Sequence, residues 1–310
     1  MERRGADGPA ALQATQGFER DELWRRARLI ECWIERTASA DALAWFRQTL
    51  DSLDQDENAR VLARALALAP RRLGKADLPL NANDFRLSNE VRAGFDPTAL
   101  TADQAARMVF LLASYREAAS FARTLEALTR TADLGELVSY YRSLALLPMS
   151  DDLTRRAAEG VRSGMKPVFE AVAHRNPYPR EAFDQNTWNH MVLKAVFIGS
   201  ELSPIQGLDE RTNPELSDML VDYAEERWAA DRPVSVELWR GLGRYVNERS
   251  MTALSRLLES GSQQETWAAA LALRQCDSPR AGDLLARYGD VDRQVMTGRI
   301  NWQSLRDDTV

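Results

Sequence analysis

The chain has 310 residues, with 40 lysine and arginine side chains against 46 aspartate and glutamate side chains, so its formal charge is −6. Apolar residues make up 45 % of it and charged residues 28 %, which is typical of a folded globular protein and excludes a disordered or fibrous chain. The acidic balance argues against nucleic acid as the main partner, because phosphate binding needs a basic surplus or patch.

Cysteine usage and hydropathy predict a cytoplasmic protein. Cys32 and Cys276 are too few and too far apart for a disulfide framework or a structural zinc site. The sequence has no apolar run long enough to span a membrane, and its N-terminus lacks the apolar centre of a signal peptide. Glycine-rich nucleotide loops and the nucleophile motif GxSxG are also missing. We therefore expect no membrane insertion, no metal and no cofactor.

Helical spacing of apolar residues dominates the chain after a short N-terminal segment. Residues 1 to about 18 are small and polar with no periodicity, which predicts a disordered tail. From there on, apolar side chains recur at three- and four-residue intervals, as at Leu23, Ala27, Ile30 and Ile34. No segment alternates as a half-buried strand would, so the sequence predicts about thirteen helices and no sheet.

Several helix starts are marked by residues that cap helices. Thr101 and Ser262 are each followed three residues later by glutamine or glutamate, which is the spacing of a capping box. Asn213 and Ser278 each precede a proline, whose missing N–H is harmless in the first turn. These four residues are predicted to begin helices.

Short helices that follow one another through tight turns predict a right-handed α-solenoid of degenerate HEAT-like helical hairpins. The stretch ETWAAALALRQCDSPRAGDLLARY has the order of such a hairpin: a small-residue helix, a polar turn with proline and a leucine-rich helix. An irregular all-α domain is the alternative, since the repeats have no strict period. We expect one helical domain over residues 19–310, in which the segment 71–100 is an irregular crossover.

Chemically unusual residues are concentrated between about residues 174 and 240. Both histidines of the chain, His174 and His190, lie there. His190 and Lys194 are four residues apart and so are neighbours on one helix face, where they could serve acid–base chemistry or bind an anion. The alternative, which we favour, is a partly buried histidine bonded to a nearby turn, beside a solvated lysine.

The polar connection GSELSPIQGLDERTNP offers a second candidate site. It carries Asp209 and Arg211 directly before a helix that begins near Pro214. Amides at that helix start could bind an anion over which Arg211 closes. The favoured alternative is a charged loop in which Asp209 or Arg211 pins the connection to a neighbouring helix, with Ile205 and Leu208 as its apolar anchors.

The next predicted helix has an acidic face. Asp222 and Glu225 are close to one another at helical spacing and could bind a cation or act as an acid–base pair. Repulsion between exposed like charges at this spacing is only a few tenths of a kcal/mol, so a solvated acidic face is the favoured interpretation. Arg211 and Arg227 are also available to neutralise it.

Two runs in this region resemble the EboA family, which is encoded in ebo gene clusters of bacteria and algae. They are NPYPREAFDQNTWNHMVLKAVFIG and GLDERTNPELSDMLVDYAEERWAADRPVSVELWR. The segments GKADL (74–78) and GFDP…DQAARMVFLLA (94–113) are similar to the family's N-terminal half, so the resemblance covers most of residues 20–290. It implies a role in handling or export of secondary-metabolite precursors and supplies no catalytic residues. Glutamine often stands in the family where this chain has His190, which argues against proton transfer by that histidine.

The sequence and the resemblance together predict a non-catalytic scaffold or binding protein of the ebo pathway. It would bind another ebo-pathway protein or a small-molecule precursor in a groove lined by residues 174–240. The alternative is an enzyme of a cyclitol- or isoprenoid-type pathway that uses acid–base residues of the same region. The side chains expected to line the groove are His174, Asn186, Trp188, Asn189, His190, Lys194, Asp209, Arg211, Asp222, Glu226 and Arg227.

Overall fold

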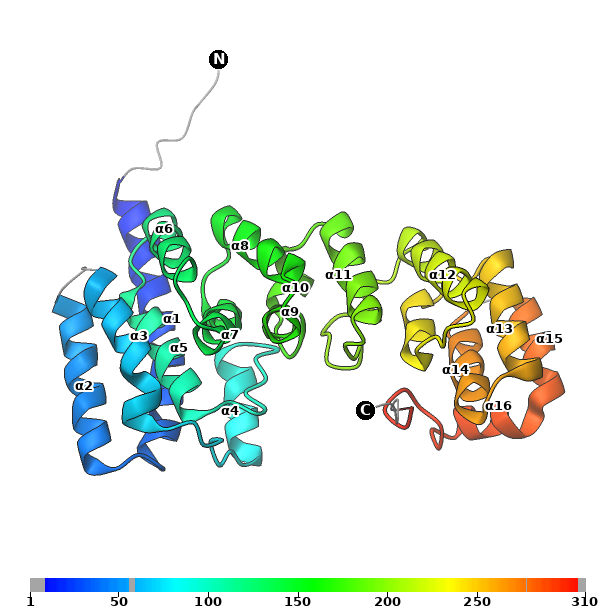
Figure 1. Ribbon diagram of the computed structural model, residues 1–310, viewed down its shortest axis with the longest axis horizontal. Coiled ribbons are helices and arrows are strands. Elements are labelled where there is room, and N and C mark those ends of the chain that lie inside the picture. The colour runs from blue at the N-terminus through cyan, green and yellow to red at the C-terminus, as the bar shows by residue number, and fades with distance from the viewer. Residues whose placement is uncertain (1–8, 56–58, 277, 306–310) are drawn as a thin grey trace, which may run out of the picture. The chain divides into compact units, whose positions relative to one another are not determined.

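The fold is all-α, as the sequence predicts. The computed structural model describes residues 9–55, 59–276 and 278–305 of the chain (Figure 1). These residues form sixteen α-helices and three short 3-10 helices, and they contain no β-strand.

The chain divides into two compact units, Met1–Ala182 and Phe183–Val310, each of which is described by itself. The helices of the first unit are α1 (Pro9–Glu35), α2 (Ala40–Gln55), α3 (Ala59–Leu73), α4 (Ala82–Val91), α5 (Ala102–Ser114), α6 (Ala118–Thr129), α7 (Leu134–Ser143), η1 (Leu144–Leu146), α8 (Asp151–Arg162), α9 (Lys166–Ala173) and α10 (Tyr178–Ala182). Those of the second are α11 (Gln185–Phe197), α12 (Pro214–Ala229), η2 (Val236–Leu242), α13 (Glu248–Ser260), α14 (Gln263–Arg274), α15 (Pro279–Leu285), η3 (Ala286–Tyr288) and α16 (Gly289–Met296). The single domain expected over residues 19–310 stays a prediction.

The helix boundaries differ from the expected ones in two places. Residues 1–8 of the expected disordered tail lie outside the described residues, and α1 begins at Pro9, within that tail. Its first turns contain alanine, leucine and glutamine, which favour helix even without an apolar stripe. Helices α10 and α16 have only 5 and 8 residues, shorter than apolar periodicity reveals, which contributes to the structure having more helices than expected.

The segment 71–100 is only partly irregular, because α4 lies within it. The side chain of Asn81 accepts hydrogen bonds from the amides of Asn83 and Asp84, and the Asp84 carboxylate accepts one from the Asn81 amide. This capping box starts a helix that has little apolar periodicity of its own. Outside α4 and the end of α3, the segment is irregular backbone with a few turns and bends.

Two of the four expected helix caps are confirmed. Ser262 and Asn213 each accept a hydrogen bond from an amide in the first turn of the helix that follows. Thr101 precedes α5 but its side chain accepts no such bond; its hydroxyl donates to the Asp103 carboxylate at 2.6 Å. Ser278 precedes α15 without a side-chain cap. Spacing alone therefore predicts where these helices begin but not which partner each side chain takes.

Helix α5 is the central helix of the first unit. It contacts α1, α2, α3 and α7, and its side chains from Ala105 to Ala113 are at most 3 % exposed. A helix that is apolar on all sides needs neighbours on all sides. Farther along the chain, α7 packs on both α5 and α9 while α6 packs on α8, so α5, α7 and α9 form one row and α6 and α8 a second (Figure 1).

In the second unit, α14 has the corresponding central place. It contacts η2, α13, α15 and α16, and its residues Ala268–Leu273 are buried (Figure 1). Four of these six residues are alanine, which lets the neighbouring helices approach closely. Helix α12 packs on α11, on α13 and on η2, and so connects the long loop before it to the core of the unit.

A buried carboxylate ties α4 to α1. Asp84 accepts hydrogen bonds from the Trp33 indole at 3.1 Å and from the Arg36 guanidinium at 2.7 and 2.8 Å. Its side chain has no solvent exposure. The hydrogen bonds from Arg36 outweigh the opposing effect of burial and lower the pKa of Asp84 below its usual value.

The Asp84 contacts predict a loss of stability in acid. A carboxyl group with a lowered pKa in the folded state stabilises that state fully above the usual aspartate pKa of about 3.9, and the contribution is lost as the pH falls through the lowered value. We expect Asp84→Asn to lower the free energy of unfolding by about 1–3 kcal/mol at neutral pH and by progressively less below about pH 4. Urea unfolding across this pH range measures the difference, with exposed Asp51→Asn as the control. A difference that stays constant down to the acid limit would contradict the assignment.

Candidate functional site

The connection between α11 and α12 is fixed near its start by a buried carboxylate. Glu237, in η2, is 7 % exposed and accepts hydrogen bonds from the amides of Leu202 at 2.6 Å and Ser203 at 3.2 Å. Ile205 and Leu208 are buried, as expected of apolar anchors. Because a charged acceptor bonds two amides strongly, Glu237 holds the start of the connection against η2.

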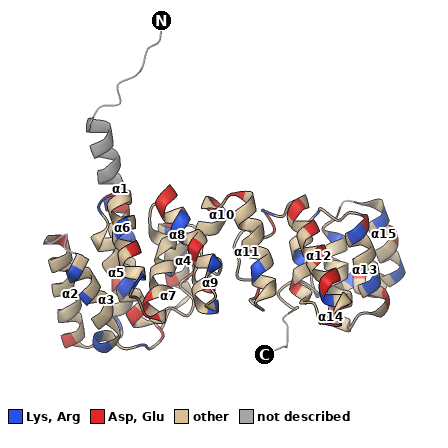
Figure 2. Cartoon of the chain, turned by 45° about the horizontal axis from the view of Figure 1, so that its top comes forward, with Lys and Arg blue, Asp and Glu red and all other residues tan. Residues whose placement is uncertain are grey.

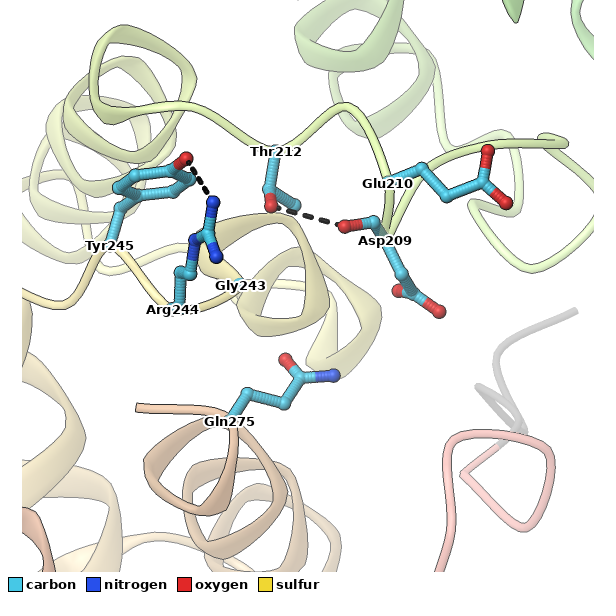
Figure 3. A pocket seen from close by; sticks show the side chains of 7 residues that line it. All are labelled: Asp209, Glu210, Thr212, Gly243, Arg244, Tyr245 and Gln275. Carbon is cyan, nitrogen blue, oxygen red and sulfur yellow. Dashed lines mark hydrogen bonds between the residues drawn. The ribbon is translucent and has the colours of Figure 1, made fainter. Parts of the chain in front are cut away.

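A cavity of about 370 Å³, here called the Gln275 pocket, opens where this connection meets the turn after η2 and the end of α14 (Figure 3). The Oε1 atom of Gln275 is buried and has no hydrogen-bond partner among the described residues. Arg244 donates from Nη2 to the Tyr245 hydroxyl at 3.3 Å, and its guanidinium lies 5.3 Å from the centre of that ring. The pocket is lined by Asp209, Glu210, Thr212, Gly243, Arg244, Tyr245 and Gln275.

Asp209 contributes a carboxylate that is already paired. The Nε and Nη2 atoms of Arg240 donate to its two oxygens, each at 2.7 Å, and this hydrogen bonding raises the pKa of Arg240. The hydroxyl of Thr212 donates to the Asp209 carbonyl at 3.2 Å. Such a two-point contact fixes the orientation of the carboxylate. Asp209 is therefore a positioned hydrogen-bond acceptor at the pocket rather than an unpaired base.

Gly243 lets the turn after η2 approach the connection closely. Its φ is +53°, a backbone conformation that residues with a side chain rarely adopt. A Cβ atom there would lie 2.4 Å from the Thr212 hydroxyl oxygen and 2.7 Å from its Cβ. The position therefore requires glycine for both its backbone conformation and its contact, and this close approach forms one wall of the pocket (Figure 3).

A separate cluster ties α11 to the start of α12. The Arg211 guanidinium lies 4.6 Å from the centre of the Trp188 ring and donates to the Phe183 carbonyl at 2.8 Å. Burial lowers the pKa of Arg211. Asn189 and Asn213 exchange two side-chain hydrogen bonds, of 3.1 and 2.8 Å. In these contacts Arg211 pins the connection to a neighbouring helix, which is the interpretation that the sequence favoured.

The acidic face of α12 is neutralised by a residue of the next helix. Asp222 and Glu225 are exposed and accept hydrogen bonds from Nη2 of Arg249, in α13, at 2.7 and 2.5 Å. These bonds raise the pKa of Arg249. Arg227, one of the two arginines available in the sequence, donates to the Pro233 carbonyl at 3.0 Å. Figure 2 accordingly shows acidic and basic residues close together along α12 and α13.

The remaining predicted side chains lie on other parts of the surface. Asn186 and His190 are exposed on α11, and Glu226 is exposed on α12. Lys194 is half-buried, and that burial lowers its pKa. His174 is half-buried where α9 ends, in the first unit. Among the side chains predicted to line the groove, Asp209 lines the Gln275 pocket.

A comparison with models of protein families matches residues 26–243 to the family described as metabolite traffic protein EboA. The chain belongs to the EboA family. The resemblance found in the sequence is thereby confirmed. Comparisons with curated proteins and with solved structures find no match. In the part of this EboA-family chain that the structure describes, no helix is both long and apolar enough to cross a membrane, and no three histidine, cysteine, aspartate or glutamate side chains could hold a metal ion together.

The match to the EboA family ends inside the lining of the Gln275 pocket. Gly243 is its last residue, and Arg244 and Gln275 lie beyond it. Sequence reasoning missed these residues and the ion pair of Asp209 with Arg240, because each depends on a contact between distant segments. One signal was present: two glycines flank a single leucine in the run GLGR directly after Arg240, which indicates a tight turn between two charged side chains.

Proposed function

We propose that this chain is a non-catalytic binding protein that holds a small polar metabolite in the Gln275 pocket. The description of the EboA family as a metabolite traffic protein supports the class of ligand. The observation that carries the assignment to this pocket is the buried Oε1 of Gln275, which has no partner among the described residues. A buried acceptor without a partner is costly, and a ligand that donates a hydrogen bond to it removes that cost once the half-buried Gln275 side chain turns its oxygen toward the cavity.

The remaining lining indicates what the ligand carries. Asp209 and Glu210 supply carboxylates, whereas Arg244 and Tyr245 supply hydrogen-bond donors, so both kinds of group surround the cavity (Figure 3). A volume of about 370 Å³ is at the small end of the range for metabolite sites. The ligand that suits this lining is a compact molecule with both donor and acceptor groups, and it is bound without a covalent step.

The proposal includes a helical scaffold. We infer that the helices stack as a right-handed α-solenoid of degenerate HEAT-like hairpins, in which residues 174–240 contribute to the binding surface. The two rows in the first unit, one of α5, α7 and α9 and the other of α6 and α8, support this arrangement. The proposed location is the cytoplasm, and the proposed partners are other ebo-pathway proteins or a small-molecule precursor. A cyclitol- or isoprenoid-type enzyme stays the alternative.

Recovery of bound small molecules tests this function. The purified full-length protein is mixed with a small-molecule extract of the cells from which its gene comes, and is then washed and denatured. The released compounds are identified by mass spectrometry. We expect at least one compact polar compound to be retained, and to be retained about tenfold less by the double variant Arg244→Gln/Gln275→Leu.

Arg287→Gln is the matched control, because Arg287 is an exposed arginine of the same unit outside the pocket. This variant should retain the compound as the unaltered protein does. Circular dichroism melting checks that all variants are folded. Equal retention by the double variant, or no retained compound at all, would show that the pocket is not the metabolite site.

A further inference from the structure

A second cavity, in the first unit, is built from one face of each of two neighbouring helices. It has a volume of about 340 Å³ and lies between α2 and α3, which pack against each other; we call it the α2–α3 groove. On each helix the lining positions recur at three- and four-residue intervals, so each helix presents a continuous strip to the groove. The lining residues are Trp45, Gln48, Thr49, Ser52, Val61, Arg64, Ala65, Leu68 and Arg72.

The described lining of the groove is positively charged. Arg64 and Arg72 contribute two guanidinium groups, and no aspartate or glutamate is among the lining residues that the structure describes, although the chain as a whole has a net charge of −6. Arg64 is exposed and forms no hydrogen bond or ion pair with another described residue. An exposed guanidinium without a carboxylate beside it keeps all its donors available for an anion.

An aromatic ring forms one wall of the same groove. Trp45 is half-buried and packs edge-to-face on the buried Phe110, with ring centres 5.7 Å apart, so the core holds its orientation. The Arg72 guanidinium lies 5.9 Å from the centre of the Trp45 ring, at the outer limit of a cation–π contact of about 6 Å. Because Arg72 is exposed, it can move aside while a flat ligand stacks on the indole.

The rest of the lining separates apolar from polar groups. Val61, Ala65 and Leu68 of α3 form an apolar strip beside the two arginines. On α2 the hydroxyls of Thr49 and Ser52 donate to backbone carbonyls of their own helix, at 2.7 and 2.9 Å, which leaves their oxygens as acceptors. The groove therefore combines a stacking surface, an apolar strip and two cationic groups.

We propose that the α2–α3 groove binds an organic anion with a flat aromatic body. The ring stacks on Trp45 and lies along the apolar strip, and Arg64 and Arg72 bind its carboxylate or phosphate group. This site is in a different unit from the Gln275 pocket, and it does not depend on the metabolite proposed there.

The test follows the indole N–H signals of full-length protein labelled with isotope-enriched tryptophan by NMR. Trp45→Phe identifies the Trp45 signal by its loss. Naphthoate is the first probe, naphthamide is its uncharged analogue, and naphthyl phosphate replaces the carboxylate with a phosphate. We expect naphthoate or naphthyl phosphate to shift the Trp45 signal in a saturable way, and naphthamide to bind about tenfold more weakly. Whichever of the two anions binds more tightly identifies the anionic group.

Single substitutions assign the anion contact to the two arginines. Arg64→Gln and Arg72→Gln should each weaken binding of the tighter anion about tenfold. Arg71→Gln is the matched control, since Arg71 is an exposed arginine of the same helix that does not line the groove, and it should leave binding unchanged. The proposal is overturned if no probe shifts the Trp45 signal, if naphthamide binds as tightly as the anions, or if Arg71→Gln weakens binding as much as Arg64→Gln does.

Discussion

Replacing Arg107 with methionine should lower the free energy of unfolding by about 3–5 kcal/mol. Arg107 and Asp103 form an ion pair inside the central helix α5, with Nη1 and Oδ2 3.2 Å apart and side chains that are 2 % and 5 % exposed. Arg107 also donates from Nε to the Leu66 carbonyl at 3.0 Å. Methionine fills similar space but leaves the Asp103 carboxylate buried without its countercharge. Urea unfolding at neutral pH measures the loss.

Two comparisons separate the buried charge from the loss of packing. The double variant Asp103→Leu/Arg107→Met leaves no buried charge and should recover most of the lost stability. Arg130→Met removes a pair of the same spacing at the end of α6, between Arg130 and Glu126, whose side chains are 74 % and 49 % exposed. That change should lower the free energy of unfolding by less than about 0.5 kcal/mol. If Arg107→Met were as mild as Arg130→Met, the ion pair would not be buried as described.

The sequence is most informative where a local pattern alone decides the structure. Leu23, Ala27, Ile30 and Ile34 recur at helical spacing, and the structure buries all four. Ser262 caps α14 as its spacing predicts, because its partner lies three residues away. Such features need no knowledge of distant segments. The class of fold, most helices and the EboA family follow from patterns of this kind.

The candidate site depends on partners that are distant in sequence. Asp209 is paired by Arg240, 31 residues away, and the acidic face of α12 is paired by Arg249, not by the arginines nearer in sequence. Side chains from different helices and loops meet only when the helices pack against each other. The local sequence therefore does not reveal which of these pairs form. Gln275 has no charge and belongs to no motif, and its role is visible only in the cavity that it lines.

At Gly243 the backbone conformation and a side-chain contact both require glycine. Gly243→Ala should lower the free energy of unfolding by about 3 kcal/mol or more, since it adds backbone strain at φ +53° to an overlap with Thr212. Because the same turn forms a wall of the Gln275 pocket, retention of the polar metabolite should fall together with stability. Urea unfolding and the mass-spectrometric recovery assay measure the two effects.

Two controls distinguish the effect of backbone strain at Gly243 from the effect of steric overlap with Thr212. Gly199→Ala adds a Cβ at φ +65° in the same unit with no heavy atom within 4 Å, so it should lower stability by only about 1 kcal/mol. In a Thr212→Gly background the overlapping atoms are gone, and adding Gly243→Ala should then cost clearly less than it does in the unaltered protein, because only the backbone strain at φ +53° and ψ −136° remains. If Gly243→Ala lowers stability equally in that background, the contact with Thr212 does not exclude a side chain at this position. Backbone strain alone would then explain why glycine is required.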